Sequence, residues 1–167
     1  MKYFIVGLLS ALVFSACSSK ETQEQNIEPK IRVEKSVADL ILNDQHEKAH
    51  SITADTKTLI FAFSKEVGHT CNDFFATKSD TYLNDNNALF IADVSAAPSL
   101  IRSMFIMPGL KDFKHTVLVI DDETVSNAYK AGHDSEKILL VSLQDKTITA
   151  IKSLNTTAEL ATAIETK

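Results

Sequence analysis

The chain has 167 residues, of which 44% are hydrophobic and 23% are charged, and its formal net charge at pH 7 is −5. This length and composition are typical of one globular domain with a single core. The mild acidity, with no basic patch and no Arg-rich stretch, argues against nucleic acid as a partner.

Residues 1–16 have the features of a signal peptide. Lys2 supplies a short positive region, and the apolar run at residues 3–14 is too short to cross a bilayer as a helix. The sequence Phe14-Ser15-Ala16-Cys17 then resembles the lipobox of bacterial lipoproteins. That resemblance implies that Cys17 carries a diacylglycerol and that the new amino terminus carries a further acyl chain such as palmitate. An ordinary secretory signal and a buried N-terminal helix are the alternatives.

Residues 17–35 predict a flexible tether, because they are polar, charged and poor in large apolar side chains. Ser18 follows the lipidated cysteine, and in the lipoprotein family this position without Asp implies transport to the outer membrane of a Gram-negative host. We therefore expect a protein of the cell envelope that faces the periplasm and contacts the membrane through the lipid on Cys17. Residues 36–167 are expected to form the folded domain.

Hydrophobic periodicity predicts strands that alternate with helices along this domain. The expected order is a hairpin (38–43 and 48–52), a strand (58–63), a helix from Cys71, a strand (88–93), a helix from Pro98 to Pro108-Gly109, a strand (115–120), a second hairpin (137–143 and 147–151) and a last helix. Thr156 and Glu159 form a capping box for that helix. This order requires a central, partly parallel sheet covered by helices.

Two segments between these elements complete the prediction. The helix from Pro98 has an apolar stripe made by Leu100, Ile101, Met104 and Phe105. Residues 121–136 are polar and are expected to form a surface loop.

The order of elements resembles that of thioredoxin-like proteins. The turn from Leu42 through Asp44 and Gln45 to Lys48 resembles the "L-x-D-Q-x-G-K" turn of the redoxin and thiol-peroxidase branch, with Glu47 in place of the usual Gly. The fold class implied is α/β: a thioredoxin-like three-layer sandwich with a central mixed sheet, flanking helices and an N-terminal β-hairpin. The stretch from Phe90 to Pro98 is also similar to that of small secreted bacterial proteins of this type, a likeness that implies fold and no activity.

The redox motif of thioredoxins is incomplete in this chain. Alignment of residues 63–71 with Cys-x-x-Cys places Gly68 at the nucleophile and Cys71 at the resolving position, and a resolving cysteine alone cannot run a disulfide cycle. Cys71 has no intrachain partner once Cys17 is assigned to lipid. The resemblance also implies a cis-proline before a core strand, and His115 stands at the matching position. Cys71 is most simply a buried apolar residue, while a monothiol redox or thiol-peroxidase role for it as the catalytic residue is the alternative.

A second alternative is metal handling. If the fold is thioredoxin-like, we expect His69, Cys71 and His115 to converge at one end of the sheet, and two imidazoles with a thiolate suit Cu(I) or Zn(II). Copper chaperones with this scaffold have the motif Cys-x-x-x-Cys plus a distal His. This chain has no second cysteine near Cys71.

The sequence therefore favours a degenerate thioredoxin-like domain that binds or supports another envelope protein without catalysis. No cofactor is expected.

Overall fold

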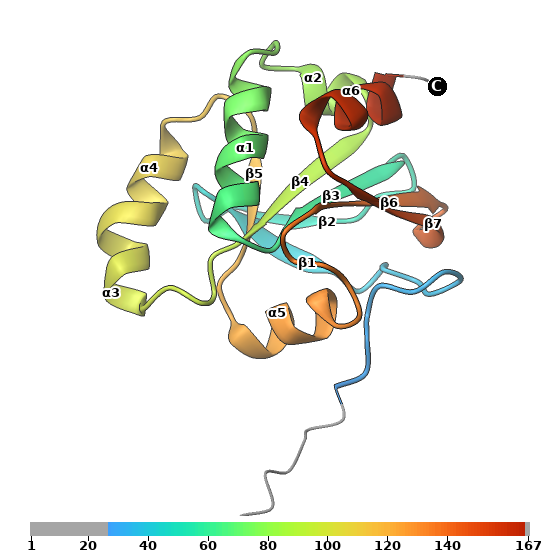
Figure 1. Ribbon diagram of the computed structural model, residues 1–167, viewed down its shortest axis with the longest axis horizontal. Coiled ribbons are helices and arrows are strands. Elements are labelled where there is room, and N and C mark those ends of the chain that lie inside the picture. The colour runs from blue at the N-terminus through green and yellow to red at the C-terminus, as the bar shows by residue number, and fades with distance from the viewer. Residues whose placement is uncertain (1–26, 166–167) are drawn as a thin grey trace, which may run out of the picture.

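The computed structural model describes residues 27–165, and Figure 1 shows a central sheet with helices on both sides. The predicted signal peptide, Cys17 and the first part of the predicted tether lie outside the described residues. The strands are β1 (Ile41–Asp44), β2 (Ala49–Ser51), β3 (Thr58–Ala62), β4 (Ala88–Asp93), β5 (Val117–Ile120), β6 (Ile138–Gln144) and β7 (Thr147–Leu154). The helices are α1 (Lys65–Ala76), α2 (Tyr82–Asp85), α3 (Ser99–Ile101), α4 (Met107–Lys111), α5 (Glu123–Lys130) and α6 (Thr157–Glu165), and the π-helical segment η1 (Arg102–Ile106) joins α3 to α4.

The seven strands form one mixed sheet in the order β2-β1-β5-β4-β3-β6-β7. The strands β3, β4 and β5 are parallel, whereas the hairpin β1–β2 and the hairpin β6–β7 are antiparallel additions on either side. Every residue of β3 and of β5 is buried, as expected for central strands covered on both faces. The predicted α/β class with an N-terminal hairpin is confirmed.

The core has two halves, one on each face of the sheet. Along β3, Ile60 points into one half and Phe61 into the other, because successive side chains of a strand alternate. The first half is covered by α1, α4 and α6, and the second by α5 and the segment before β1. The protein is thus a three-layer sandwich. Within residues 27–165, no helix has both the length and the apolar composition needed to cross a bilayer.

The segment before β1 belongs to the folded domain. Ile31 is only 1% exposed and packs in the second half of the core. Backbone hydrogen bonds join Glu34 to Ile148 (2.8 Å) and Ile148 to Lys35 (2.9 Å), so this segment lies along β7. The predicted tether, residues 17–35, is therefore too long at its carboxyl end. A single buried isoleucine within a polar stretch is not enough for periodicity to identify.

The turn between β1 and β2 is fixed by the side chains that carried the redoxin resemblance. Asp44 Oδ1 accepts hydrogen bonds from the backbone N–H groups of His46 (2.8 Å) and Lys48 (3.0 Å). The buried Gln45 amide donates to the carbonyl of His115 and accepts from the N–H of Val117, both at 2.9 Å. The turn thereby attaches the hairpin to β5.

Helix α5 lies inside the predicted surface loop, residues 121–136. Asp122 caps it, since its Oδ1 accepts from the N–H of Val125 at 2.9 Å. Two buried residues attach the helix to the sheet. Tyr129 stacks on Phe61 with ring centroids 6.0 Å apart, and the Ser126 hydroxyl donates to Asp93 at the end of β4. This polar anchor explains why the segment looks like a loop in sequence.

The helical stretch after β4 does not end at Pro108. Because proline has no N–H and its ring collides with the carbonyl four residues back, a regular α-helix cannot continue through it. The helix instead makes a wider, π-helical turn, in which the N–H of Met107 donates to the carbonyl of Arg102, five residues back. This register turns Leu110 into the core and leaves the predicted apolar stripe in solvent, with Leu100, Ile101, Met104 and Phe105 between 41% and 65% exposed.

Candidate functional site

Thioredoxin-type sites lie where the strand β3 meets the helix α1, and here that junction is a helix cap. The Ser64 Oγ accepts from the N–H of Val67 at 3.4 Å, and the carbonyl of Ser64 accepts from the N–H of Gly68 at 2.9 Å. The helix starts at Lys65, well before the predicted start at Cys71. Gly68 is therefore already inside the helix and not at its exposed end.

The thiol of Cys71 is part of the hydrophobic core. Its exposed fraction is 0%, and it packs in the same half of the core as Val67 and Phe75. Burial raises the pKa of Cys71 to about 12, so the thiol is protonated at neutral pH. A helix terminus stabilises a thiolate only within the first turn, and Cys71 lies beyond it. This side chain has neither the exposure nor the electrostatics of a nucleophile.

A cysteine at position 68 would meet no steric obstacle. A Cβ built on Gly68 finds no atom within 4 Å. The absence of the second sulfur is thus a property of the sequence and not a demand of the packing. Position 68 lies inside the helix, so a thiolate placed there would nevertheless gain little stabilisation from the helix dipole.

His115, the position matched to the family's cis-proline, does not precede a strand that pairs with β3. The strand antiparallel to β3 is β6, and the Glu136 carboxylate just before it accepts a hydrogen bond from Ser64 Oγ at 3.4 Å. His115 precedes β5, which is separated from β3 by β4. Residues 27–165 contain no cis peptide bond.

His115 is a core residue at the other end of the sheet. It is 4% exposed, and its ring lies 5.1 Å from that of Phe113 and 5.4 Å from that of Phe75, measured between centroids. Its Nε2 is 3.0 Å from Oδ1 of Asn72, while Nδ1 is buried without a partner. Because the Asn72 oxygen can only accept, Nε2 carries the hydrogen and Nδ1 is bare. Burial lowers the pKa of His115 to about 4, so the ring is neutral at pH 7.

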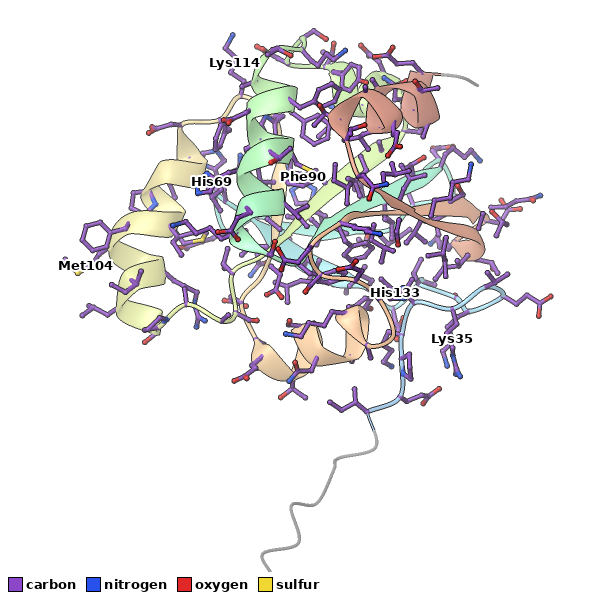
Figure 2. All side chains as sticks on the ribbon, viewed as in Figure 1. Lys35, His69, Phe90, Met104, Lys114 and His133 are labelled. Carbon is purple, nitrogen blue, oxygen red and sulfur yellow. The ribbon has the colours of Figure 1, made fainter. Side chains whose placement is uncertain are left out.

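The structure does not bring the predicted metal set together. His69 is exposed on α1, as Figure 2 shows, whereas Cys71 on the same helix is fully buried. Residues two positions apart on an α-helix point to different sides of it. His115 precedes β5 and contacts the carboxyl-terminal half of α1. Within residues 27–165 there is no cluster of three or more His, Cys, Asp or Glu side chains that could hold a metal.

A groove of about 870 Å³ opens elsewhere, beside β1. Its walls come from β1 and the residues just before it, from α3 and η1, and from the end of β5 with the start of α5. In open α/β sheets, ligands commonly bind beyond the carboxyl ends of the parallel strands, and the end of β5 is such a place. Sequence reasoning missed this groove because no motif marks it and its walls come from separate parts of the chain.

Solved structures share this architecture. A peroxiredoxin-like protein from Aquifex aeolicus aligns with a TM-score of 0.50 over 84% of this chain and 90% of its own, at 7% identity. The thioredoxin domain of a thiol-disulfide oxidoreductase from Bacteroides vulgatus aligns with a TM-score of 0.49 over 80% of this chain and 99% of its own, at 9% identity. No protein-family model matches the sequence, and no curated protein matches it significantly.

These findings define a thioredoxin-like α/β fold of the kind that redoxins also have. At such low identity, the likeness establishes the fold alone.

Proposed function

We propose that this protein is an envelope lipoprotein whose thioredoxin-like domain binds another envelope protein and performs no thiol chemistry. The observation that carries the proposal is the burial of Cys71, whose thiol lies in the core with its pKa raised to about 12. A monothiol peroxidase or oxidoreductase would need that sulfur as an accessible thiolate. Copper or zinc handling would need it within reach of other ligands, and His69 lies on the exposed side of the same helix.

Binding is the role that the surface supports. The exposed apolar side chains of α3 and η1 are neighbours along one helical stretch, and Figure 2 shows Met104 projecting away from the ribbon there. Contiguous exposed apolar groups on a soluble domain commonly mark an interaction surface. The lipobox resemblance at Cys17 adds the location: a lipid anchor that holds the domain on the periplasmic side of the outer membrane.

Redox assays test the non-catalytic part of the proposal. Full-length protein and its Cys71→Ala variant are compared for reduction of insulin in the presence of dithiothreitol and for consumption of hydrogen peroxide. We expect both proteins to match the rate without protein. An enzyme-like rate in the wild type that Cys71→Ala abolishes would refute the proposal and establish the monothiol alternative.

Metal handling is tested by the melting temperature of the full-length protein with and without Zn²⁺ or Cu⁺. Selective binding to the folded state raises the melting temperature as metal exceeds the dissociation constant. We expect no rise that depends on Cys71, so the wild type and Cys71→Ala should respond alike. A rise that this substitution removes would support the metal alternative instead.

Fractionation tests the location. In a Gram-negative host, the full-length chain should be found in the outer membrane, and Cys17→Ala should release it from that fraction. Mass spectrometry should find a diacylglycerol on Cys17 in the wild type. Membrane attachment that survives Cys17→Ala would contradict the lipoprotein part of the proposal without affecting the non-catalytic part.

A further inference from the structure

The geometry points to the groove beside β1, together with the exposed ridge of α3 and η1, as the docking surface for a protein segment that carries Lys or Arg next to large apolar side chains. This inference rests on the proposed binding function and names its site and the chemistry of the partner. The ridge is defined as Leu100, Ile101, Met104 and Phe105.

The groove and the ridge belong to the same helical stretch. Ser99, Arg102 and Ser103 line the groove, while the ridge residues between and after them project into solvent. The widened π turn that precedes Pro108 sets this division, because it rotates the ridge away from the core. Ile41 of β1 also lines the groove and is 64% exposed. An apolar side chain in the groove would therefore contact Ile41, and a neighbouring apolar side chain of the same segment would cover the ridge.

The negative charge of the groove favours a cationic partner. Four carboxylates line it (Asp39, Glu47, Asp121 and Asp122) against one guanidinium, so the formal charge of the lining is −4 + 1 = −3. Among residues 27–165, none of these carboxylates forms an ion pair with a Lys, Arg or His side chain.

The one cation of the lining is already engaged. Arg102 Nη1 donates to the carbonyls of Ser95 (2.8 Å) and Ala97 (3.0 Å), and so holds the loop that leads into α3. Of the carboxylates, Asp122 accepts a hydrogen bond from the N–H of Val125 at the start of α5, which partly offsets its negative charge. Asp39, Glu47 and Asp121 have no such donor among the described residues. A surface of this kind attracts cationic segments and repels acidic ones.

Three other occupants fit less well. The nine residues that precede the described part after Cys17 (18–26) hold one lysine, two glutamates and no large apolar side chain. A second copy of the chain brings net negative charge to a negative groove. A bilayer that contains anionic lipids would be repelled by the same carboxylates.

Peptide binding tests the inference with full-length protein. The probe is a short fluorescein-labelled peptide of repeating Lys-Leu-Leu-Lys units, followed by fluorescence anisotropy, and the comparison peptide has Glu in place of every Lys. We expect saturable binding of the first peptide, weakening with added salt, and no binding of the second. Equal binding of both peptides, or binding of neither, would overturn the inference.

Matched variants locate the binding surface. Asp39→Asn combined with Asp121→Asn should weaken binding about fivefold, since two exposed charge pairs are lost and each contributes modestly. Asp55→Asn combined with Asp145→Asn removes the same charge from loops at the opposite end of the sheet and should leave the affinity unchanged. Equal losses in the two double variants would overturn the assignment.

The ridge has its own pair of variants. Phe105→Ser should weaken binding about tenfold if this side chain anchors the peptide. Val33→Ser changes another apolar residue that is 54% exposed, in the segment that lies along β7, and should have no effect. Both positions are solvent-facing, so neither change threatens the fold.

Photo-cross-linking separates the possible occupants. Full-length protein with p-benzoylphenylalanine at position 105 is irradiated with the Lys-Leu peptide in the presence of vesicles of phosphatidylethanolamine and phosphatidylglycerol. Cross-links to the peptide support the inference, whereas cross-links mainly to lipid or to a second copy overturn it. Failure here leaves the redox assays of Cys71→Ala untouched, so the docking surface and the non-catalytic role stand or fall separately.

Discussion

The buried imidazole of His115 makes the stability of this domain depend on pH. In the unfolded chain a histidine has its ordinary pKa of 6.5, and in the folded protein burial lowers the pKa of His115 to about 4. The folded state therefore resists protonation of Nδ1, which has no partner to receive the new hydrogen. Stability from this residue is fully present above the unfolded pKa and is lost as the pH falls from 6.5 toward 4.

The size of the effect follows from the two pKa values. At about pH 5 the unfolded state has gained nearly a full proton and the folded state almost none, and this pH is about 1.5 units below the unfolded pKa. Since one unit corresponds to about 1.4 kcal/mol, the free energy of unfolding should fall by about 2 kcal/mol between neutral pH and about pH 5. Full protonation of the folded state would bring the total to about 3 kcal/mol.

Urea unfolding at the two pH values, followed by circular dichroism, measures this loss. His115→Phe keeps the aromatic contacts with Phe75 and Phe113 but cannot titrate, so its unfolding free energy should fall by about 2 kcal/mol less than that of the wild type. It will be less stable at both pH values because Asn72 loses its partner, and only the difference between pH values is compared. His46→Gln, at an exposed position, should behave as the wild type does. An equal pH dependence in His115→Phe and the wild type would refute the reasoning.

Further predictions concern α1 and the contact between β4 and α5. Gly68→Cys restores both sulfurs of the motif, but we expect no insulin reduction, because the new thiol lies inside the helix and Cys71 stays buried; turnover at a thioredoxin-like rate would contradict this. Ser64→Ala removes the cap of α1 and should lower the unfolding free energy by about 1 kcal/mol in urea titrations. An unchanged unfolding free energy would show that the bond from Val67 N–H to Ser64 Oγ does not stabilise the helix. Ser126→Ala removes a buried hydrogen bond to Asp93 and should cost about 2 kcal/mol, and an unchanged urea midpoint would show that this bond does not fix α5.

Sequence reasoning found the parts of the fold in which one signal dominates. The apolar runs that became β3, β4 and β5, the last of them rich in β-branched residues, were predicted as buried strands of a central sheet. The capping box before α6 formed as expected, with Thr156 Oγ1 accepting from the N–H of Glu159 at 3.2 Å and Glu159 Oε2 accepting from the N–H of Thr156 at 3.3 Å. The turn at Asp44 and Gln45 was recognised by its residues, and its hydrogen bonds explain why those residues are needed.

The errors arose where tertiary contacts outweigh local pattern. Helix α5 is held by Ser126 and Tyr129 on a polar segment, and both contacts are with residues far away in the chain. The sequence showed the ridge as an apolar stripe, but a stripe alone does not tell whether those side chains or others such as Leu110 face the core. Only the π turn before Pro108 decides between them, and periodicity at 3.6 residues per turn cannot include it.

The predicted site residues lie apart for a related reason. Position in the sequence suggested that His115 and Cys71 would lie together, yet the depth of a side chain depends on the helix register. Once Ser64 is fixed as the cap, Cys71 falls on the inner side of α1 and His69 on the outer side. The missing sulfur was visible in the sequence, and burial was already the simplest interpretation of the remaining one, which the structure places fully inside the core.

Alkylation of Cys71 tests the central claim most directly. In the Cys17→Ala background, Cys71 is the single thiol of the chain. The account predicts that iodoacetamide modifies Cys71 in the folded protein slowly, because the thiol reacts only when the protein transiently unfolds. The alkylation rate should not level off near neutral pH, as it would for a thiolate of low pKa, and in urea the reaction should be rapid. Complete labelling of the folded protein within minutes, with an apparent pKa below that of a free cysteine, would show an accessible thiolate and contradict the account.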